Sequence, residues 1–518
     1  MNGEPLSPRQ SLLLSGASIA AYFLALFNAG SYNAINPHAM GAFGVSPSHG
    51  PWTMGDFFAA QAFGLVLGPA LSARFGYLEV FRGSIWTAAA GSLLCAAAPT
   101  FLPFLGGRIL QGFGSGVAVP LAQTILLEQH PEERRPVVAA FWSMAGLAPY
   151  SLSPVAGALM EERWGWRSWF LVNAPLLLLA GEICVLLAGR PDVRPSRPWD
   201  RIGALLLGSG ILSIQSALNM GDDYDWYNSP LVVGLLLGGL IAIAYFVVWE
   251  LGERYPLIDL RLFLRPGFSV GILTMTVAFF FFFGLWTTLL VRVQLPSFGG
   301  FTSFLAAQIF VPLLFLSLPA AGLFSQLPPK AHHLRLFACG NLLLFSLYCW
   351  LFSYYDYFER RSWFFPILGT QVLEGLCLGT LLRPLGGLMV AGLSPRKQAY
   401  ALELSASFRA LASGLGIDGF VSILYRRTAF DQKRLTETFP PFGPMTDEVL
   451  DRLHQSGLGE EQGLGWLLNH RLLLHANILS LEDAFRFAAW GFLVMAAMLA
   501  LVPVVRLARR WLQESGNP

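Results

Sequence analysis

The chain has 518 residues, of which 54% are hydrophobic and only 13% are charged, so it is far more apolar than an average soluble protein. Its net charge of +2 is too small to indicate a nucleic-acid partner. The five cysteines lie in apolar runs with no paired spacing, which argues against a disulfide framework or a metal site. This composition predicts an all-α integral membrane protein with no metal and no cofactor.

A membrane-spanning helix needs about 20 apolar residues, and fourteen stretches of the sequence meet this requirement. In chain order their approximate ranges are 12–36, 52–73, 79–99, 101–127, 137–159, 168–189, 202–220, 230–251, 268–292, 303–326, 333–354, 363–389, 399–424 and 485–507. The first run is too long for the core of a signal peptide, so we expect that helix to be retained.

Basic residues are distributed unequally between alternate loops, and this bias indicates which side faces the cytoplasm. The loops at 37–51, 221–229 and 293–302 contain no Lys or Arg. The alternate connections carry most of them, including Arg74, Arg82, Arg134, Arg135, Arg190, Arg194, Arg197, Arg201, Arg254, Arg261, Arg265, Lys330, Arg335, Arg396 and Lys397. We therefore expect both termini to be cytoplasmic, in agreement with the even helix count.

The polar segment at 425–484 separates the last two apolar runs. It contains a Pro-rich stretch at 440–444, followed by helix-like spacing at 446–469. We expect an outer loop with a small helical element. It could be a surface that docks a partner or an inert cap over the outer mouth.

An arginine, Arg108, lies inside the apolar run at 101–127. A charge at bilayer depth costs roughly 2.5–3.5 kcal/mol on insertion scales, so such a residue usually faces a bundle interior. Gln111 shares its helix face, and Gly112 and Gly116 form a small-residue stripe for close helix packing. The alternative is an arginine that snorkels to the interface beside a packing groove.

The spacing R-x-x-Q-G-x-G-x-G at 108–116 resembles the fourth-helix motif of major facilitator superfamily transporters. The segment Trp164-Gly165-Trp166-Arg167 with Phe170, Asn173 and Pro175 resembles the entry to the sixth helix of fourteen-helix drug:proton antiporters of the EmrB/QacA type. Matches at 200–203, 225–226 and 256–263 strengthen this resemblance, which is greatest to EmrB-like pumps of Gram-negative bacteria.

The resemblance implies a major facilitator fold with fourteen transmembrane helices and access that alternates between two faces. It implies a six-helix lobe at 1–190, an inserted pair of helices at 191–265 and a second six-helix lobe at 266–518, which includes the loop at 425–484. It also implies location in the bacterial inner membrane.

The sequence departs from the family pattern in two helices. In the first, Asn33 and Pro37 remain, but Asn28 replaces the expected acid, and an amide cannot carry a proton. In the fifth, only Pro154 and Gly157 of the antiporter pattern survive, although Pro149 adds helix-breaking character.

If proton coupling persists, other carboxylates must carry it. Depth along the helices, at 1.5 Å per residue, places Asp56 level with Arg108, and Glu374 level with Arg409. A nearby cation and burial act on such acids in opposite directions, so we expect Asp56 and Glu374 to divide the coupling. The alternative to proton coupling, for each acid, is a structural ion pair between helices. Glu182, Glu403 and Asp418 are reserve candidates, and Glu182 has no obvious partner.

Aromatic residues offer a lining for a substrate cavity. The run at 279–283 consists of five phenylalanines and is followed by Trp286. Such a site favours flat, lipophilic ligands, but five successive residues cannot share one helix face. We therefore expect some of these rings to face lipid.

Together these observations predict a secondary active efflux transporter for lipophilic or amphipathic small molecules, working by proton antiport, of the kind that confers antibiotic resistance. No P-loop or nucleophile constellation indicates an enzyme. A narrow-substrate exporter for a siderophore or amphiphile with altered coupling is one alternative, and a non-transporting receptor or scaffold is another. The resemblance also implies an EmrA-like periplasmic adaptor and an outer-membrane channel as partners.

Overall fold

The computed structural model describes residues 7–131, 133–188, 198–295, 300–325, 331–354, 360–438, 448, 451 and 461–515. Throughout these residues the chain forms helices and no strand, which confirms the predicted all-α class. The first eight α-helices are α1 (Pro8–Phe43), α2 (His49–Phe75), α3 (Tyr77–Ala97), α4 (Phe101–Glu128), α5 (Arg135–Trp164), α6 (Arg167–Ala188), α7 (Arg201–Met220) and α8 (Pro230–Gly252). The remaining ones are α9 (Pro266–Gln294), α10 (Ser303–Gln308), α11 (Leu313–Ser325), α12 (Ala331–Phe352), α13 (Arg360–Val390), α14 (Pro395–Thr438) and α16 (Glu461–Ser515).

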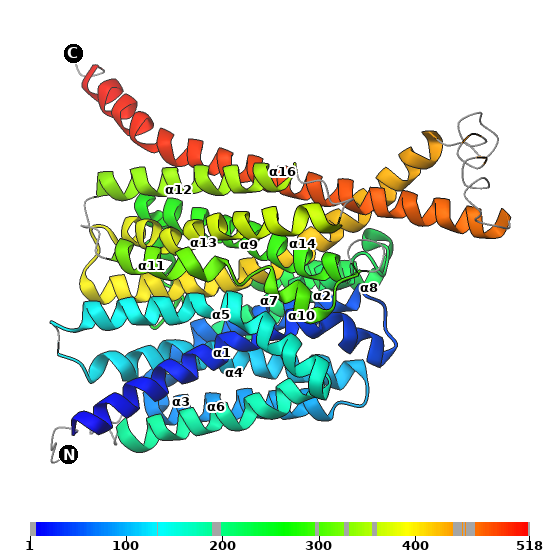
Figure 1. The fold of residues 1–518 in the computed structure, drawn as a ribbon. Coiled ribbons are helices and arrows are strands. Elements are labelled where there is room, and N and C mark those ends of the chain that lie inside the picture. Colours follow the sequence, from blue (N-terminus) through cyan, green and yellow to red (C-terminus); the bar gives the residue numbers. More distant parts are fainter. Residues whose placement is uncertain are drawn as a thin grey trace.

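The long helices lie side by side in one bundle (Figure 1). In the described part of the chain, thirteen helical segments are long and apolar enough to cross a membrane, with α10 and α11 together forming one of them. The more polar α5, with 30 residues, runs beside them and packs on α1. Thirteen of the fourteen predicted spans therefore each fall on one helix, and the span at 303–326 is divided between α10 and α11.

Close helix contacts explain the glycine stripe on α4. A Cβ atom added to Gly112 would meet the backbone of Phe57, and one added to Gly116 would meet the backbone of Gln61. On α5, a Cβ at Gly157 would meet the backbone of Ser31. These glycines let α4 approach α2, and α5 approach α1, at backbone distance, as expected for small residues between membrane helices.

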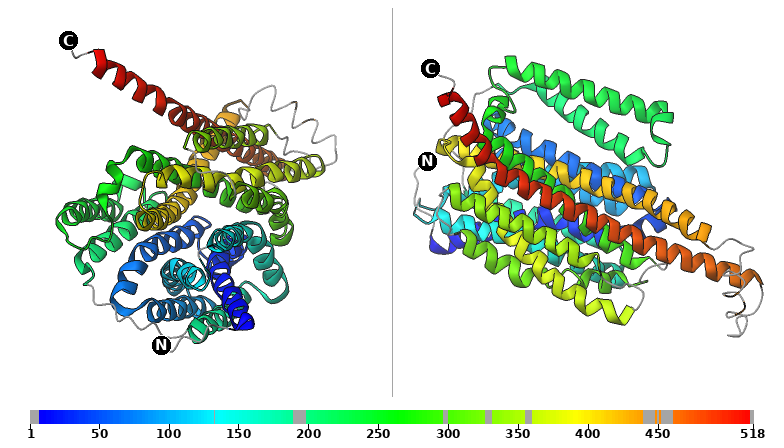
Figure 2. Two further views of the ribbon diagram at one scale, coloured as in Figure 1. Left: turned by 90° about the vertical axis from the view of Figure 1, so that its left-hand side faces the viewer. Right: turned by 90° about the horizontal axis from the view of Figure 1, so that it is seen from above.

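The helices α7 and α8 form a hairpin at one edge of the bundle (Figure 2). Asp200 caps α7 by accepting a 2.9 Å hydrogen bond from the backbone N–H of Gly203. The same carboxylate accepts the indole N–H of Trp249 on α8 at 3.0 Å, so one acid begins α7 and holds α8 against it. The other face of α7 packs on α2 and α14.

The predicted loop at 425–484 is largely helical, which corrects the sequence-based expectation. Residues 425–438 continue α14, which is 44 residues long, and residues 461–484 belong to α16, which is 55 residues long. Both helices project beyond the rest of the bundle (Figure 1). The Pro-rich stretch at 440–444 and most of the predicted element at 446–469 lie outside the described residues.

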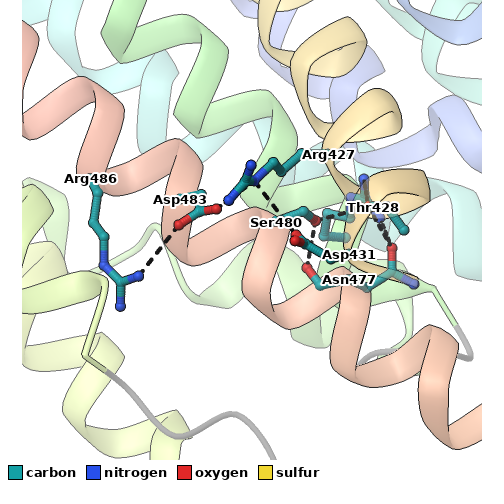
Figure 3. A network of polar contacts seen from close by, with 8 residues as sticks. Arg427, Thr428, Asp431, Asn477, Ser480, Asp483 and Arg486 are labelled. Atoms are coloured by element: carbon teal, nitrogen blue, oxygen red, sulfur yellow. Dashed lines mark hydrogen bonds and ion pairs between the residues drawn. The ribbon is translucent and has the colours of Figure 1, made fainter. Parts of the chain in front are cut away.

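A polar network braces the base of this projection (Figure 3). Arg427 on α14 pairs with Asp483 on α16 at 2.6 Å, and Thr428 and Ser480 share a hydrogen bond of 2.9 Å. Arg292 of α9 donates to Asn477 of α16. The projection is thus tied to the membrane bundle by side chains from three helices.

The beginning of α1 and the end of α16 lie at the same end of the bundle, opposite the projection (Figure 1). This arrangement agrees with an even number of crossings. The side of the membrane that each end faces stays a prediction from the basic residues.

Candidate functional site

Arg108 lies in the interior of the bundle and is completely buried. Its guanidinium group lies between two aromatic rings, 4.4 Å from the centroid of Tyr32 and 4.4 Å from that of Phe57. Nη1 donates to Oε1 of Gln111, whose Nε2 donates to the hydroxyl of Ser92 at 2.6 Å. The shared face of Arg108 and Gln111 is confirmed, and the snorkelling alternative is excluded because the side chain does not reach water.

The predicted pair between Asp56 and Arg108 is wrong. Phe57 contacts the guanidinium, and successive residues of a helix point about 100° apart, so Asp56 faces α7 instead. There its Oδ1 accepts a 2.9 Å hydrogen bond from Nδ2 of Asn219. Within the described part of the chain, no ion pair joins Asp56 or Arg108 to any residue. The estimate of equal depth said nothing of the helix face to which each side chain belongs.

A second buried carboxylate joins this cluster. Nε2 of Gln215 on α7 donates to Oδ2 of Asp418 on α14, and also to Oδ1 of Asn219 at 3.2 Å. Two amides of α7 thus connect an acid of α2 with an acid of α14. A Cβ atom on Gly55 would collide with all three polar groups that face it, those of Gln215, Asn219 and Asp418, so the absent side chain of Gly55 makes room for the cluster.

Sequence reasoning did not single out Gln215 and Asn219. The available signal was two amides four residues apart, and therefore on one face, in an otherwise apolar helix. Asp418 was only a reserve candidate. Arg292 of α9 donates to Asn477 and Thr428.

The predicted pair between Glu374 and Arg409 is also wrong. Oε2 of Glu374 accepts the hydroxyl of Tyr348 on α12 at 3.0 Å, and that hydroxyl accepts Nε2 of Gln371 at 3.0 Å. Arg409 lies 5.2 Å from the ring centroid of Phe279 and near Tyr22 and Tyr150. Glu374 thus faces its neighbour α12, while Arg409 faces α1, α5 and α9.

The residues of the first-helix motif lie where α1, α5 and α9 meet. Asn28 is fully buried, and its amide has no hydrogen-bond partner among the described residues. Nδ2 of Asn33 donates to the hydroxyl of Thr287 at 3.3 Å, which joins α1 to α9. A Cβ at Gly30 would lie 3.2 Å from the indole of Trp286 and would collide with Ser153, between Pro149 and Pro154 of α5.

The phenylalanine run at 279–283 departs from expectation, because its rings pack against helices. Phe279, Phe281, Phe282 and Phe283 are at most 6% exposed, and Phe280 is partly buried. The reason is that α9 is enclosed by α1, α13, α14 and α16. Phe281 contacts rings of both α14 and α16, and Phe283 lies 5.7 Å from Trp286.

At the end opposite the termini, side chains link α1 and α5 with α9 and α10. His38 lies 3.6 Å from a carboxylate oxygen of Glu161 and 3.2 Å from the hydroxyl of Ser303. Glu162 accepts the backbone N–H of Phe304 at 3.1 Å. These contacts hold this end of the helix bundle together.

Comparison with known proteins identifies the family. The sequence profile of the Major Facilitator Superfamily matches residues 19–417, which is most of the chain. This chain belongs to the Major Facilitator Superfamily.

Two relatives match the chain over nearly its full length. The fatty acid resistance protein FarB of Neisseria gonorrhoeae is 27% identical over 514 residues, which cover 97% of this chain and 99% of FarB. The multidrug export protein EmrB of Escherichia coli K12 is 27% identical over 502 residues, which cover 96% of each chain. The membership and these relatives confirm the predicted resemblance and agree with a transporter rather than an enzyme.

Solved structures share the superfamily fold. A bacterial homologue of the human lysosomal transporter Spinster, inward-facing and unoccupied, superposes with a TM-score of 0.61 at 15% identity, covering 96% of this chain and 97% of that one. The POT family transporter PepTSo superposes with a TM-score of 0.61 at 14% identity, covering 96% and 99%. At this identity the likeness concerns the fold alone.

The reserve candidate Glu182 is only partly buried. Glu182 on α6, which had no obvious partner from sequence, pairs with Nε of Arg82 on α3 at 2.9 Å and accepts the indole N–H of Trp86 at 2.8 Å. Both of its partners lie on the neighbouring helix and are at least half exposed. Glu182 is thus ion-paired and partly exposed, so it provides a control variant for the buried acids.

Proposed function

We propose that the protein is a secondary active exporter of lipophilic or amphipathic small molecules, driven by proton antiport with alternating access. The observation that carries this proposal is the bonding of Asp56 and Glu374. Both acids are at most 3% exposed, and neutral groups supply their hydrogen bonds among the described residues. An acid without a fixed cation can exchange its proton without breaking an ion pair, and buried acids in membrane helices mark proton relays.

The substrate class rests on the relatives and on the aromatic interior. FarB is described as a fatty acid resistance protein and EmrB as a multidrug export protein. In this chain, Phe283 and Trp286 lie at the junction of α9 with α1 and α5. Aromatic surfaces between helices suit apolar ligands of varied shape.

For the transport cycle, we propose that the helices at 1–190 and at 266–518 rock as two lobes, with the pair at 191–265 inserted between them. Asn33 with Thr287, and His38 with Ser303, then lie across the lobe interface and separate as the outer end opens. The basic-residue bias supports an inner-membrane orientation with both termini in the cytoplasm.

For partners, we propose that the projection of α14 and α16 docks an EmrA-like periplasmic adaptor that leads to an outer-membrane channel. The brace from Arg427 to Asp483 gives the projection a fixed base. Deleting 440–465 should abolish co-purification with such an adaptor while the membrane bundle stays folded. Unchanged co-purification would assign docking to another surface.

A narrower function is favoured by one observation. Asn28 stands where related antiporters carry an acid, and its amide is buried without a partner among the described residues. A narrow-substrate exporter with altered coupling would use this amide to bind a polar group of its ligand, whereas a receptor or scaffold would move no substrate at all.

The experiment that tests the proposal is uptake of a fluorescent lipophilic dye into inside-out membrane vesicles. An imposed pH gradient, acidic inside, should drive uptake, and collapsing the gradient should stop it. Equal dye uptake with and without the pH gradient would favour altered coupling. No uptake over a broad panel of dyes would favour a receptor or scaffold.

A further inference from the structure

We propose that Asp56 and Asp418 form a two-carboxylate site that holds a single proton between them while the outer end is closed, and that Gln215 and Asn219 of α7 position the pair. This inference rests on the proposed antiport and assigns a role to the inserted helix α7. It places the exchanging proton where α2, α7 and α14 meet, at Asp56, Gln215, Asn219 and Asp418. We call this position the seam of the three helices.

The hydrogen-bond chain carries the first step of the argument. It runs from Asp56 through Asn219 and Gln215 to Asp418, and all four side chains are at most 8% exposed. Amides supply donors but no positive charge. Two negative charges at bilayer depth without a cation are costly, and like charges in one site favour a proton on one of them.

The second step of the argument rests on two buried oxygen atoms that have no hydrogen-bond partner among the described residues. They are Oδ1 of Asp418 and Oε1 of Gln215. Both are acceptors, and the cluster therefore has more acceptors than donors. When hydronium in the outer water gives one proton to the carboxylate pair, an O–H bond of hydronium breaks, water is left, and the new carboxyl O–H adds the missing donor.

The charged groups around the site are engaged elsewhere. Arg108 of α4 lies between Tyr32 and Phe57 on another face of α2. Toward the outer end, Asp222, in the turn after α7, accepts Nε of Arg426 of α14 at 3.3 Å and also the hydroxyl of Ser422. Asp223 lies 3.9 Å from His49 at the start of α2.

The two remaining cations near the seam are also engaged. Arg292 of α9 donates to Asn477, and Arg409 of α14 lies over Phe279. Among the described residues, none of these groups makes an ion pair with Asp56 or Asp418.

The position in the fold explains how the site would couple to transport. Gln215 of α7 donates to Asp418 of α14, and Asp222, in the turn after α7, accepts from Ser422 and Arg426 of α14, so the end of α7 is joined to α14. Asp56 comes from α2, in the other group of six helices, and a Cβ on Gly414 would lie only 3.0 Å from the carbonyl oxygen of Gly55. When the outer end opens, α2 leaves this seam, Asp56 separates from Asn219, and outer water reaches both acids.

The test is infrared titration of carboxyl groups in the purified full-length protein, which needs no substrate. Two interacting acids titrate in two steps that belong to the pair. The parent should show both steps, and Asp56→Asn and Asp418→Asn should each lose the same, upper step. Loss of a different step in each variant would show two independent acids and overturn the proposal.

The positioning role of α7 has its own test. Asn219→Leu should shift the pH profile of both steps without removing either, and Asn219→Gln should restore the profile by returning an amide. Glu182→Gln, remote from the seam, should leave both steps of the Asp56 and Asp418 pair unchanged. An unshifted profile in Asn219→Leu would remove α7 from the site.

Transport separates this inference from the proposed function. If a pH gradient drives dye export by the parent protein, Asp418→Asn should reduce this export to background. Parental export by Asp418→Asn would overturn the shared site and leave antiport standing. Absence of gradient-driven export in the parent would overturn antiport, while the titration would still test the pair.

Discussion

The amide of Asn219 reaches from α7 to the carboxylate of Asp56 on α2, with 2.9 Å between Nδ2 and Oδ1. This contact turns Asp56 away from Arg108 and gives it a neutral partner. The acid and the arginine, which the sequence places at one depth, therefore belong to two separate clusters. Their variants should have different effects.

Replacing either candidate acid by its amide should uncouple transport from the proton gradient. Asp56→Asn and Glu374→Gln keep shape and remove the titrating group, so both should still bind a lipophilic dye. Each should lose gradient-driven dye export, measured in inside-out vesicles with Glu182→Gln as control. If both variants export at the parental rate, these two acids are structural.

Arg108 should matter for packing more than for charge balance. Nε and Nη2 are buried without partners among the described residues, and replacing a poorly satisfied buried charge by an apolar residue of similar size is often neutral or stabilising. We expect Arg108→Met to keep the stability of the parent within about 1 kcal/mol. Arg108→Ala should cost about 2–5 kcal/mol, because it leaves a cavity between Tyr32 and Phe57.

Thermal unfolding in detergent measures both Arg108 variants. Equal losses for the methionine and alanine variants would show that the positive charge itself is required. That result would imply an anion near Arg108 during folding or transport.

Close packing of α4 on α2 should be sensitive to a single methyl group. Gly112→Ala places a Cβ against the backbone of Phe57, and overpacking of this kind costs about 1–3 kcal/mol. Gly106→Ala on the same helix is the control, since a Cβ there meets nothing within 4 Å. Thermal unfolding should separate the two variants, and equal stability would contradict the close approach of α2 and α4.

Opening of the outer end should require His38 and Ser303 to separate. Cysteines at both positions, joined by a short thiol-reactive cross-linker, should stop dye export, and each single cysteine variant treated in the same way should export normally. A cleavable linker should restore export after reduction. Full export by the cross-linked protein would place the moving interface elsewhere.

Topology can be tested with reporter fusions at two positions outside the described residues. A reporter after Pro518 should read cytoplasmic, and one inserted near Gly457 should read extracytoplasmic. Finding both reporters on one side would contradict fourteen crossings.

The positions of the membrane-spanning helices could be predicted from the sequence, because hydropathy marks them. Thirteen of the predicted apolar runs each lie on one helix, and the run at 303–326 is divided between α10 and α11. The extensions of α14 beyond residue 424 and of α16 before residue 485 were missed, because a polar helix outside the bilayer has no hydropathy signal. Arg108 was placed in the interior, because a charge in an apolar run needs a protected position.

The partners of the buried side chains depend on the rotation of each helix about its axis, which depth along the helix does not provide. Asp56 and Glu374 were assigned to arginines at their own level, but the rotation of each helix turns them toward Asn219 and Tyr348. The seam of α2, α7 and α14 was invisible for a similar reason. Its amides are neutral, and they join residues more than 150 positions apart.

Proton counterflow in proteoliposomes tests the central claim most directly. A gradient of a lipophilic substrate imposed across the membrane, with no initial pH difference, should drive protons in the opposite direction, reported by a pH-sensitive dye trapped inside. Proteoliposomes with Asp56→Asn should show substrate binding but no proton movement. Substrate flux without proton movement in the parent protein, or an equal proton signal in the parent and in Asp56→Asn, would contradict antiport through this acid.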